Sequence, residues 1–312
     1  MLFLGILSLV QIWFLPGFLV ISFYKKINIF DKILVAFPLS IIFNYLIVFF
    51  LIFVDAYSQS VVILIIFFEL AFVFYIYKKN LIEFREVNIN FKFKSKIYFL
   101  DILLIFLFTI FLYLAISNIG EITFPGDPLG MWDKWAKSFA TSTIPENSMD
   151  YPQAYPILMS LSYIVIGTLE IEFFSRSVGL AYPILIWFMM LRIINIIPNY
   201  GKEIKLTLFF IALLTLNQFR HTLFIGFVDP ILVFATVAIG YTLILDKVYK
   251  FKKNYVVILC LIAILPGLLK QTALYLSFAF PIFYYFLKIK SKNINFIKTI
   301  FIYLILFSII LL

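Results

Sequence analysis

The stretch NIGEITFPGDPLGMWDKWAKSFATSTIPENSMDYPQAYP, residues 118–156, is a polar and aromatic segment between long apolar runs. It carries five acids and two lysines, although the whole chain has a net charge of +9. These charged residues are Glu121, Asp127, Asp133, Lys134, Lys137, Glu146 and Asp150. Because loops on a rigid scaffold commonly carry function, we expect binding or catalytic groups in this segment. An ordinary connector between two membrane spans is the alternative interpretation.

The composition around this segment indicates a membrane protein. Of 312 residues, 64% are hydrophobic and 13% are charged, whereas soluble domains are roughly 25% charged. Apolar runs close to the roughly 20 residues that cross a bilayer recur along the chain. The sequence therefore predicts an all-α fold, a polytopic membrane helical bundle whose extracytoplasmic loop carries short juxtamembrane helices.

The basic residues lie mainly in short connectors between the apolar runs. This pattern sets the orientation of a membrane protein, so we predict no nucleic-acid partner. Cys260 is the only cysteine and lies inside an apolar run. That position argues against a disulfide framework and against a zinc site built on cysteines.

Residues 1–97 are predicted to form an N-terminal segment with three spans. The apolar runs that would cross the membrane lie at about 2–23, 33–54 and 59–77. The basic connector 78–97 is placed in the cytoplasm by the positive-inside rule. Glu69 lies within the third run, and an intramembrane carboxyl is a candidate functional group. For Glu69 we favour a neutral, hydrogen-bonded structural role.

Residues 98–312 are predicted to form the core of the protein, with 118–156 as its outer loop. The crossing runs of this core lie at about 98–117, 178–198, 204–219, 227–245, 255–269 and 272–287. The apolar stretch 157–167 is shorter than the roughly 20 residues of a span, so we expect it to be re-entrant or interfacial. The last run, 299–312, is also short, and we expect either that the chain is truncated at its C-terminal end or that it closes on an incomplete hydrophobic hairpin.

Charged and polar side chains gather at the predicted outer ends of separate spans. They are Asp127, Asp133, Asp150, Glu170, Glu172, Arg176, Arg220, His221, Asp229, Lys270 and Gln271. A carboxylate can deprotonate an acceptor hydroxyl, and Lys or Arg can neutralise a departing phosphate. Together these groups favour glycosyl transfer from a polyprenyl-phosphate carrier. For any one of them alone, an interfacial or paired charge is the better interpretation.

Several motifs, in their order along the chain, resemble the GT-C membrane glycosyltransferases. The similarity is closest to the family 39-like group, which includes protein mannosyltransferases and aminoarabinose transferases. The matching segments are DPLGMWDKWAK from Asp127, DYP from Asp150, YP at Tyr155, IGTLEIEFFSRSVGL, FIGFVDPIL and PGLLKQTAL. The resemblance covers about residues 98–287. The chain departs from the family pattern in having three spans before the matching one and no neighbouring acidic pair, since Pro128 follows Asp127.

This resemblance implies an inverting hexosyltransferase with a GT-C-like transmembrane core. Asp127 would activate the acceptor hydroxyl, with Asp133 as the competing catalytic carboxylate. Lys270 and Arg220 would bind the carrier phosphate. Trp132, Trp135 and Tyr151 would stack on the sugar or line the lipid entry, although tryptophan at this depth is equally typical of an interfacial aromatic belt. The further substrate-binding candidates are Lys137, Asp150, Arg176, His221, Asp229 and Gln271.

We predict no metal and no cofactor, and the expected partners are all membrane-associated or extracytoplasmic. They are a polyprenyl-phosphate sugar donor, a lipid, glycan or protein acceptor, and membrane lipids. The expected location is the plasma (inner) membrane, with the active site on the extracytoplasmic side. Two alternatives remain: an O-antigen ligase or polymerase-like enzyme, and a lipid or solute transporter. Transporters typically show midplane charges and inverted repeats, whereas this chain has Glu69 and no repeat.

Overall fold

A computed structural model describes residues 1–24, 27–79, 99–118, 128–146, 151–197, 201–219, 228–249, 255–288 and 303–307. Among these residues all regular structure is helical and no strand occurs. Five of the described helical segments are long and apolar enough to cross a membrane, or six if one bent pair counts as a single span. The prediction of an all-helical protein with several membrane spans is therefore confirmed.

The first half of the described chain is arranged as follows. Its helices are α1 Leu2–Trp13, α2 Leu15–Ser22, α3 Ile29–Phe53, α4 Gln59–Lys78, α5 Phe99–Ser117, a π-helical turn Pro128–Asp133, α6 Lys134–Ala140 and α7 Ala154–Ile166. The predicted runs 33–54, 59–77 and 98–117 thus coincide closely with α3, α4 and α5. Helix α3 starts earlier than predicted because the Asn28 side chain caps it, accepting a hydrogen bond from the Phe30 amide at 2.8 Å.

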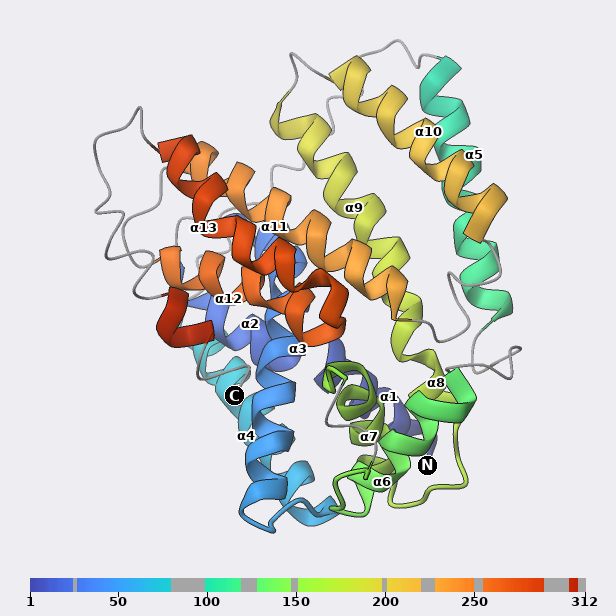
Figure 1. Cartoon of the computed structure of the whole chain (residues 1–312), viewed down its shortest axis with the longest axis vertical. Coiled ribbons are helices and arrows are strands. Elements are labelled where there is room, and N and C mark those ends of the chain that lie inside the picture. The colour runs from blue at the N-terminus through green and yellow to red at the C-terminus, as the bar shows by residue number, and fades with distance from the viewer. Residues whose placement is uncertain are drawn as a thin grey trace.

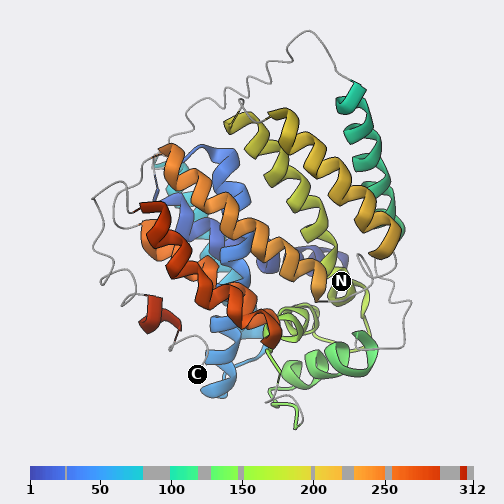
Figure 2. The same cartoon turned by 45° about the horizontal axis from the view of Figure 1, so that its top comes forward.

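The second half continues from the short helix α8 into a long span. Its helices are α8 Phe173–Ser177, the 3₁₀ turn Val178–Leu180, α9 Ala181–Ile196, α10 Gly201–Phe219, α11 Asp229–Tyr249, α12 Tyr255–Leu269, the 3₁₀ turn Gln271–Ala273 and α13 Leu274–Lys288. In both views α9 lies between α11 on one side and the pair α10 and α5 on the other (Figure 1, Figure 2).

The predicted first span, 2–23, is broken rather than straight. Helices α1 and α2 meet at an angle of 44°. Pro16 lies at the start of α2 and has no amide to donate to the carbonyl of Ile12. The Asn44 side chain on α3 donates instead to the carbonyls of Gln11 and Ile12, at 2.9 and 3.2 Å. The break therefore leaves its freed carbonyls satisfied inside the membrane.

Close packing of α2 on α3 requires glycine at position 17. The Gly17 amide donates to the Ser40 hydroxyl at 3.0 Å. A Cβ on Gly17 would lie 1.9 Å from the carbonyl oxygen of Ala36, a distance that no backbone could accommodate without shifting. The absence of a side chain thus lets the two helices touch.

At one end of the bundle, Asp31 joins three helices, and we call this the Asp31 end. The Asp31 side chain on α3 is 0% exposed. It accepts two hydrogen bonds from the Arg192 guanidinium on α9, at 2.7 and 2.9 Å. The hydroxyls of Tyr241 and Tyr249 on α11 each donate to it at 2.6 Å. A buried carboxylate with a bidentate arginine and two further donors is fully paired.

The opposite end, formed by α6, α7 and α8, is called the site end. Helix α7 remains there and does not cross the bundle. Near its C-terminal end, the Val165 carbonyl accepts from Gln59 at 3.1 Å, and Ser160 bonds to Tyr57 at 2.9 Å. Near its start, the Tyr155 hydroxyl would lie 3.2 Å from a Cβ on Gly179. Both Tyr57 and Gly179 lie at helix ends remote from Asp31, so α7 is enclosed at the site end, with every residue buried.

Helices α5 and α10 form a second apolar cluster that packs on α9. Asp101 on α5 and Lys205 on α10 form an ion pair. Trp187 on α9 packs against Phe108 and Phe111 on α5, with ring centroids 5.7 and 5.5 Å apart. Because the contacts of α5 with the rest of the bundle run mainly through α9 and α10, this pair is the peripheral layer of the fold (Figure 1).

Substitution of Asp31 by alanine is expected to destabilise the protein strongly. The change leaves the guanidinium of Arg192 and two tyrosine hydroxyls without their acceptor, and breaking a buried ion pair costs about 3–5 kcal/mol. Thermal unfolding of the purified protein in detergent measures the effect. The control is Asp101→Ala, in a more exposed pair expected to contribute about 0–1 kcal/mol. Equal losses in the two variants would contradict the assigned role of Asp31.

Candidate functional site

Four charged side chains at the site end form one balanced network. Asp133 and Lys137 lie one helical turn apart, with Lys137 Nζ 2.9 Å from Asp133 Oδ2. Lys137 also pairs with Glu172, which in turn pairs with Arg176 one turn along α8. The Tyr163 hydroxyl on α7 donates to Asp133 Oδ1. Two acids and two bases thus tie α6, α7 and α8 together.

Burial differs sharply between the members of this network. Asp133 is 4% exposed, whereas Lys137, Glu172 and Arg176 each retain a partly exposed side chain. Burial, and then the hydrogen bond to Asp133, raise the pKa of Tyr163 well above its ordinary value. The Tyr163 hydroxyl therefore stays protonated and serves as a donor. Asp133 is thus the buried member of the network, and the side chains of the other three charged residues are partly exposed.

An aromatic cluster lies beside the charged network. Trp132, 1% exposed, is at its centre. The Trp132 ring centroid lies 5.4 Å from that of Trp135, 5.1 Å from that of Tyr151 and 6.3 Å from that of Tyr155. Trp135 and Tyr155 are also buried, while Tyr151 is partly exposed. Of these four rings, Tyr151 is the one with a face open to a ligand.

Three buried polar atoms in and beside this cluster have no hydrogen-bond partner among the described residues. They are Trp132 Nε1, the Tyr155 hydroxyl and the Tyr182 hydroxyl. Tyr182 on α9 continues the cluster toward α11, since its ring centroid lies 5.1 Å from that of Phe234. An unpaired buried polar group costs about 1–3 kcal/mol. Such groups commonly indicate an ordered water or a ligand that supplies the missing partner.

A second ion pair lies at the same end of the bundle. Asp229 is the first residue of α11, and Lys270 follows α12. Lys270 Nζ lies 2.7 Å from Asp229 Oδ1. Because Tyr249, at the other end of α11, reaches Asp31, this pair must lie at the site end. The Asp229 side chain is 54% exposed, so it is the accessible partner, and the neighbouring Gln271 is exposed as well.

The structure thus brings together Asp133, Trp132, Lys137, Tyr151 and Arg176, and it places Asp229, Lys270 and Gln271 at the same end. Four predicted site residues lie outside the described residues: Asp127, Asp150, Arg220 and His221. In the part of the chain that is described, no group of three or more His, Cys, Asp or Glu side chains is arranged to hold a metal ion.

Sequence reasoning missed Tyr163 and Tyr182, which occur in apolar stretches where an aromatic residue predicts only packing. Tyr155 was noted only as part of a motif, without a role of its own. The i, i+4 spacing of Asp133 with Lys137, and of Glu172 with Arg176, is visible in the sequence and is the signal of ion pairs on a helix. The bridge from Lys137 to Glu172 joins residues 35 positions apart, which local spacing cannot reveal.

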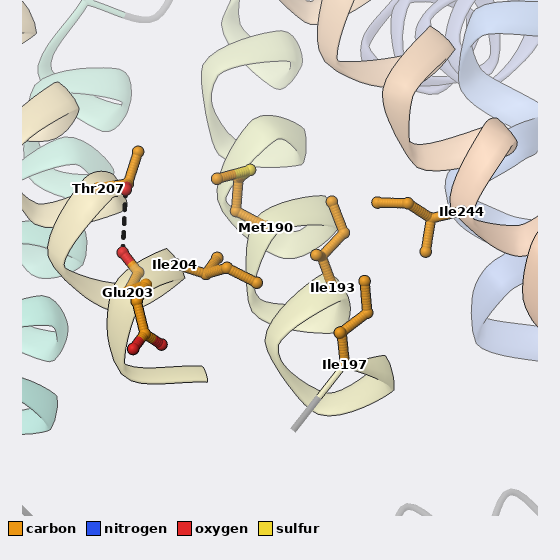
Figure 3. A pocket seen from close by; sticks show the side chains of 7 residues that line it. All are labelled: Met190, Ile193, Ile197, Glu203, Ile204, Thr207 and Ile244. Atoms are coloured by element: carbon orange, nitrogen blue, oxygen red, sulfur yellow. Dashed lines mark hydrogen bonds between the residues drawn. The ribbon is translucent and has the colours of Figure 1, made fainter. Parts of the chain in front are cut away.

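An apolar groove near the Asp31 end is separate from this site. It has a volume of about 440 Å³ and lies between α9, α10 and α11 (Figure 3). Its lining residues are Met190, Ile193, Ile197, Glu203, Ile204, Thr207 and Ile244. None of the predicted site residues that the structure describes lines it. The polar network and this groove therefore occupy opposite ends of α9.

Comparison with known proteins finds no matching family model, no similar curated protein and no similar solved structure. The likeness to GT-C glycosyltransferases consequently remains a prediction from the sequence motifs. The geometry of the site end is independent of that likeness.

Replacing Glu172 by glutamine is expected to lower the thermal stability of the protein. The substitution removes the only anion that pairs with both Lys137 and Arg176 in the described network, and hydrogen bonds to charged groups contribute about 1.5–3 kcal/mol each. Glu170→Gln is the matched control, because Glu170 is exposed in the same segment; it should change the stability by less than about 0.5 kcal/mol. The same thermal unfolding temperature for both variants would show that Glu172 does not hold α6 against α8.

Proposed function

We propose that this protein is an integral-membrane glycosyltransferase. It transfers a sugar from a polyprenyl-phosphate-linked donor to a hydroxyl acceptor, which is a lipid, a glycan or a protein. The observation that carries the proposal is that the site end of the bundle holds acids, bases and unpartnered buried polar atoms from separate parts of the chain: residues 132–137, α7, residues 172–176, α9, the start of α11 and the residue after α12. An ordinary connector between spans offers no explanation for buried polar atoms that lack a partner, whereas a ligand that supplies the partner does.

The carboxylates of the site have different roles in this proposal. Asp133 has one oxygen bonded to Tyr163 and the other paired with Lys137. Because both carboxylate oxygens are already engaged, Asp133 is poorly placed to reach an acceptor, and we assign it as a positioning residue. Asp127 precedes the same helical turn in the sequence and remains the proposed general base.

The proposed chemistry is a single inverting displacement. The acceptor hydroxyl loses its proton to the Asp127 carboxylate as its oxygen bonds to the anomeric carbon of the sugar. The bond between that carbon and the phosphate oxygen breaks, and the electron pair remains on the polyprenyl phosphate. Lys270 and Arg220 stabilise the negative charge that grows on this leaving phosphate. The lipid tail stays in the membrane throughout.

A phosphate would reach Lys270 by replacing a carboxylate. In the described part of the chain Lys270 pairs with Asp229, whose side chain is largely exposed. Exposed ion pairs are weak, about 0–1 kcal/mol, so a phosphate with a higher charge can compete for the lysine. By contrast, Glu172 holds two cations at once. This difference supports Lys270 as the phosphate ligand and assigns Lys137 and Arg176 to the framework of the site.

The sugar is proposed to lie over the aromatic cluster. The partly exposed ring of Tyr151 offers a face for stacking, and the buried Trp132 supports that ring from below. The unpartnered Trp132 Nε1 and Tyr155 hydroxyl are groups that a water or a sugar hydroxyl could satisfy. Asp150, His221 and Gln271 are further proposed ligands of the donor or acceptor.

The proposed orientation places the site end on the extracytoplasmic face of the plasma membrane. The described basic residues support it: Lys32, Lys78, Arg192, Lys202, Lys205 and Lys247 belong to the ends of α3, α4, α9, α10 and α11 near the Asp31 end. Cytoplasmic connectors are enriched in Lys and Arg, so the Asp31 end is assigned to the cytoplasm.

A transfer assay with a radiolabelled polyprenyl-phosphate sugar tests the proposal. Asp127→Asn should reduce turnover by about 10²–10⁴-fold, because the acceptor hydroxyl loses its general base. Asp133→Asn should reduce turnover less, through disorder of α6. Glu146→Gln, an acid-to-amide change at an exposed position of the same loop, should leave turnover unchanged. Wild-type turnover in both aspartate variants would remove the proposed mechanism.

A further inference from the structure

Glu69 lies near the middle of α4, a 20-residue apolar helix that is long enough to cross the membrane. Its Oε2 atom is buried and has no hydrogen-bond partner among the described residues. An ionised carboxylate at the centre of a bilayer requires a cation or a wet cavity. Whether this carboxyl is ionised or protonated therefore depends on the groups that surround it.

No base on the neighbouring helices is available to Glu69. Helices α2 and α7 pack against α4, and α1 reaches it through Gln11. None of these three helices contains Lys, Arg, Asp or Glu; their titratable side chains are the hydroxyls of Tyr155 and Tyr163 on α7. On α3, Asp31 and Lys32 lie at the Asp31 end, about 20 Å along the helix from Asn44 at 1.5 Å per residue.

The polar side chain that acts on the Glu69 carboxyl from a neighbouring helix is the amide of Gln11 on α1. The orientation of this amide is fixed by Asn44. The Asn44 nitrogen donates to the backbone carbonyls of Gln11 and Ile12, so its oxygen must be the acceptor that receives Gln11 Nε2 at 3.0 Å. Turning the Gln11 amide over would place Gln11 Oε1 against Asn44 Oδ1, two acceptors with no hydrogen between them.

In this orientation one acceptor on each side chain lacks a donor. Gln11 Oε1 and Glu69 Oε2 are both buried without a partner. An ionised carboxylate gives Gln11 Oε1 no donor, because a carboxylate carries no hydrogen. A proton on Glu69 Oε2 would turn this atom into a donor, and Gln11 Oε1 is a buried acceptor on the facing side chain that lacks one.

We propose that Glu69 is an intramembrane proton-binding site, in which the carboxylic acid and the Gln11 amide, held by Asn44, form a cyclic pair joining α4 to α1. The bound ligand is a proton. This inference does not rest on the proposed glycosyl transfer.

The pair matters because α4 has few other attachments. Of its residues, Val62, Ile66 and Ile76 are buried, and most of the others are exposed on the surface of the bundle. Loss of the proton places a carboxylate beside Gln11 Oε1 in an apolar setting, so the two side chains repel each other. Occupancy of the proton site thus controls how firmly the middle of α4 is held against α1.

Dicyclohexylcarbodiimide tests the protonation state in the intact protein. This apolar reagent adds to a protonated carboxyl: the acid proton moves to nitrogen, the carboxyl oxygen bonds to carbon, and nothing leaves. We expect peptide mass spectrometry to find the adduct on Glu69 at neutral pH, with labelling that falls as the pH is raised. Asp101, which is ion-paired with Lys205, should not be labelled. Failure to label Glu69 across the whole pH range would overturn the proposal.

Infrared spectroscopy and two substitutions test the pairing with Gln11. The wild-type protein should show the C=O band of a protonated carboxyl, absent in Glu69→Gln and shifted to higher frequency in Gln11→Leu, where the hydrogen bonds are lost. Glu69→Gln should keep the wild-type unfolding temperature, because two amides can form the same cyclic pair, whereas Glu69→Leu should lower it. Carboxylate bands alone at position 69, or equal destabilisation by Gln and Leu, would contradict the neutral pair.

Discussion

Charged and polar side chains within a bilayer need partners, because the hydrocarbon supplies none. This constraint sorts the described chain into two polar ends and a neutral middle. At one end, Asp31 is closed off by Arg192 and two tyrosines. At the other, Asp133 and Glu172, which immediately precede α6 and α8, are matched by Lys137 and Arg176 on those helices. Between them, Gln11 pairs with Asn44, and Glu69 has no base on the helices that pack against α4. The course of the helices follows from where these groups can be satisfied.

The two ends satisfy the constraint in different ways, and that difference is what allows the site end to bind a ligand. The Asp31 network is saturated: each described group in it has a partner, and the carboxylate is fully buried. The site end is balanced in charge but incomplete in hydrogen bonding, with Trp132 Nε1 and two tyrosine hydroxyls unpartnered. A saturated network stabilises a fold, whereas an incomplete one on a rigid support can bind a ligand. Helix α7, buried along its whole length, provides that support.

Much of the fold can be predicted from the sequence, because long apolar runs indicate membrane spans directly. Helices α3, α4 and α5 lie where the apolar runs predict them, and most of the short run 157–167 lies in α7, a helix of 13 residues. The break at Phe14 was missed, although Pro16 is its visible cause. The pairing of Asp31 with Arg192, and of Lys137 with Glu172, was missed because contacts between distant residues leave no local pattern. For the site, helical spacing indicates the ion pairs, while Tyr163 is hidden in an apolar run. The glycosyltransferase activity remains a prediction.

The central claim is that one end of the bundle is built to hold a lipid-linked phosphate. The most direct measurement is the binding of sugar-free polyprenyl phosphate to the purified protein, followed through its thermal stabilisation. The account predicts saturable binding, worth about 2.7 kcal/mol at a hundredfold excess over Kd. Lys270→Gln should raise the Kd at least tenfold, whereas Lys202→Gln, at an exposed lysine of the Asp31 end, should not change it. Absence of saturable binding, or an equal effect of the two substitutions, would contradict the claim.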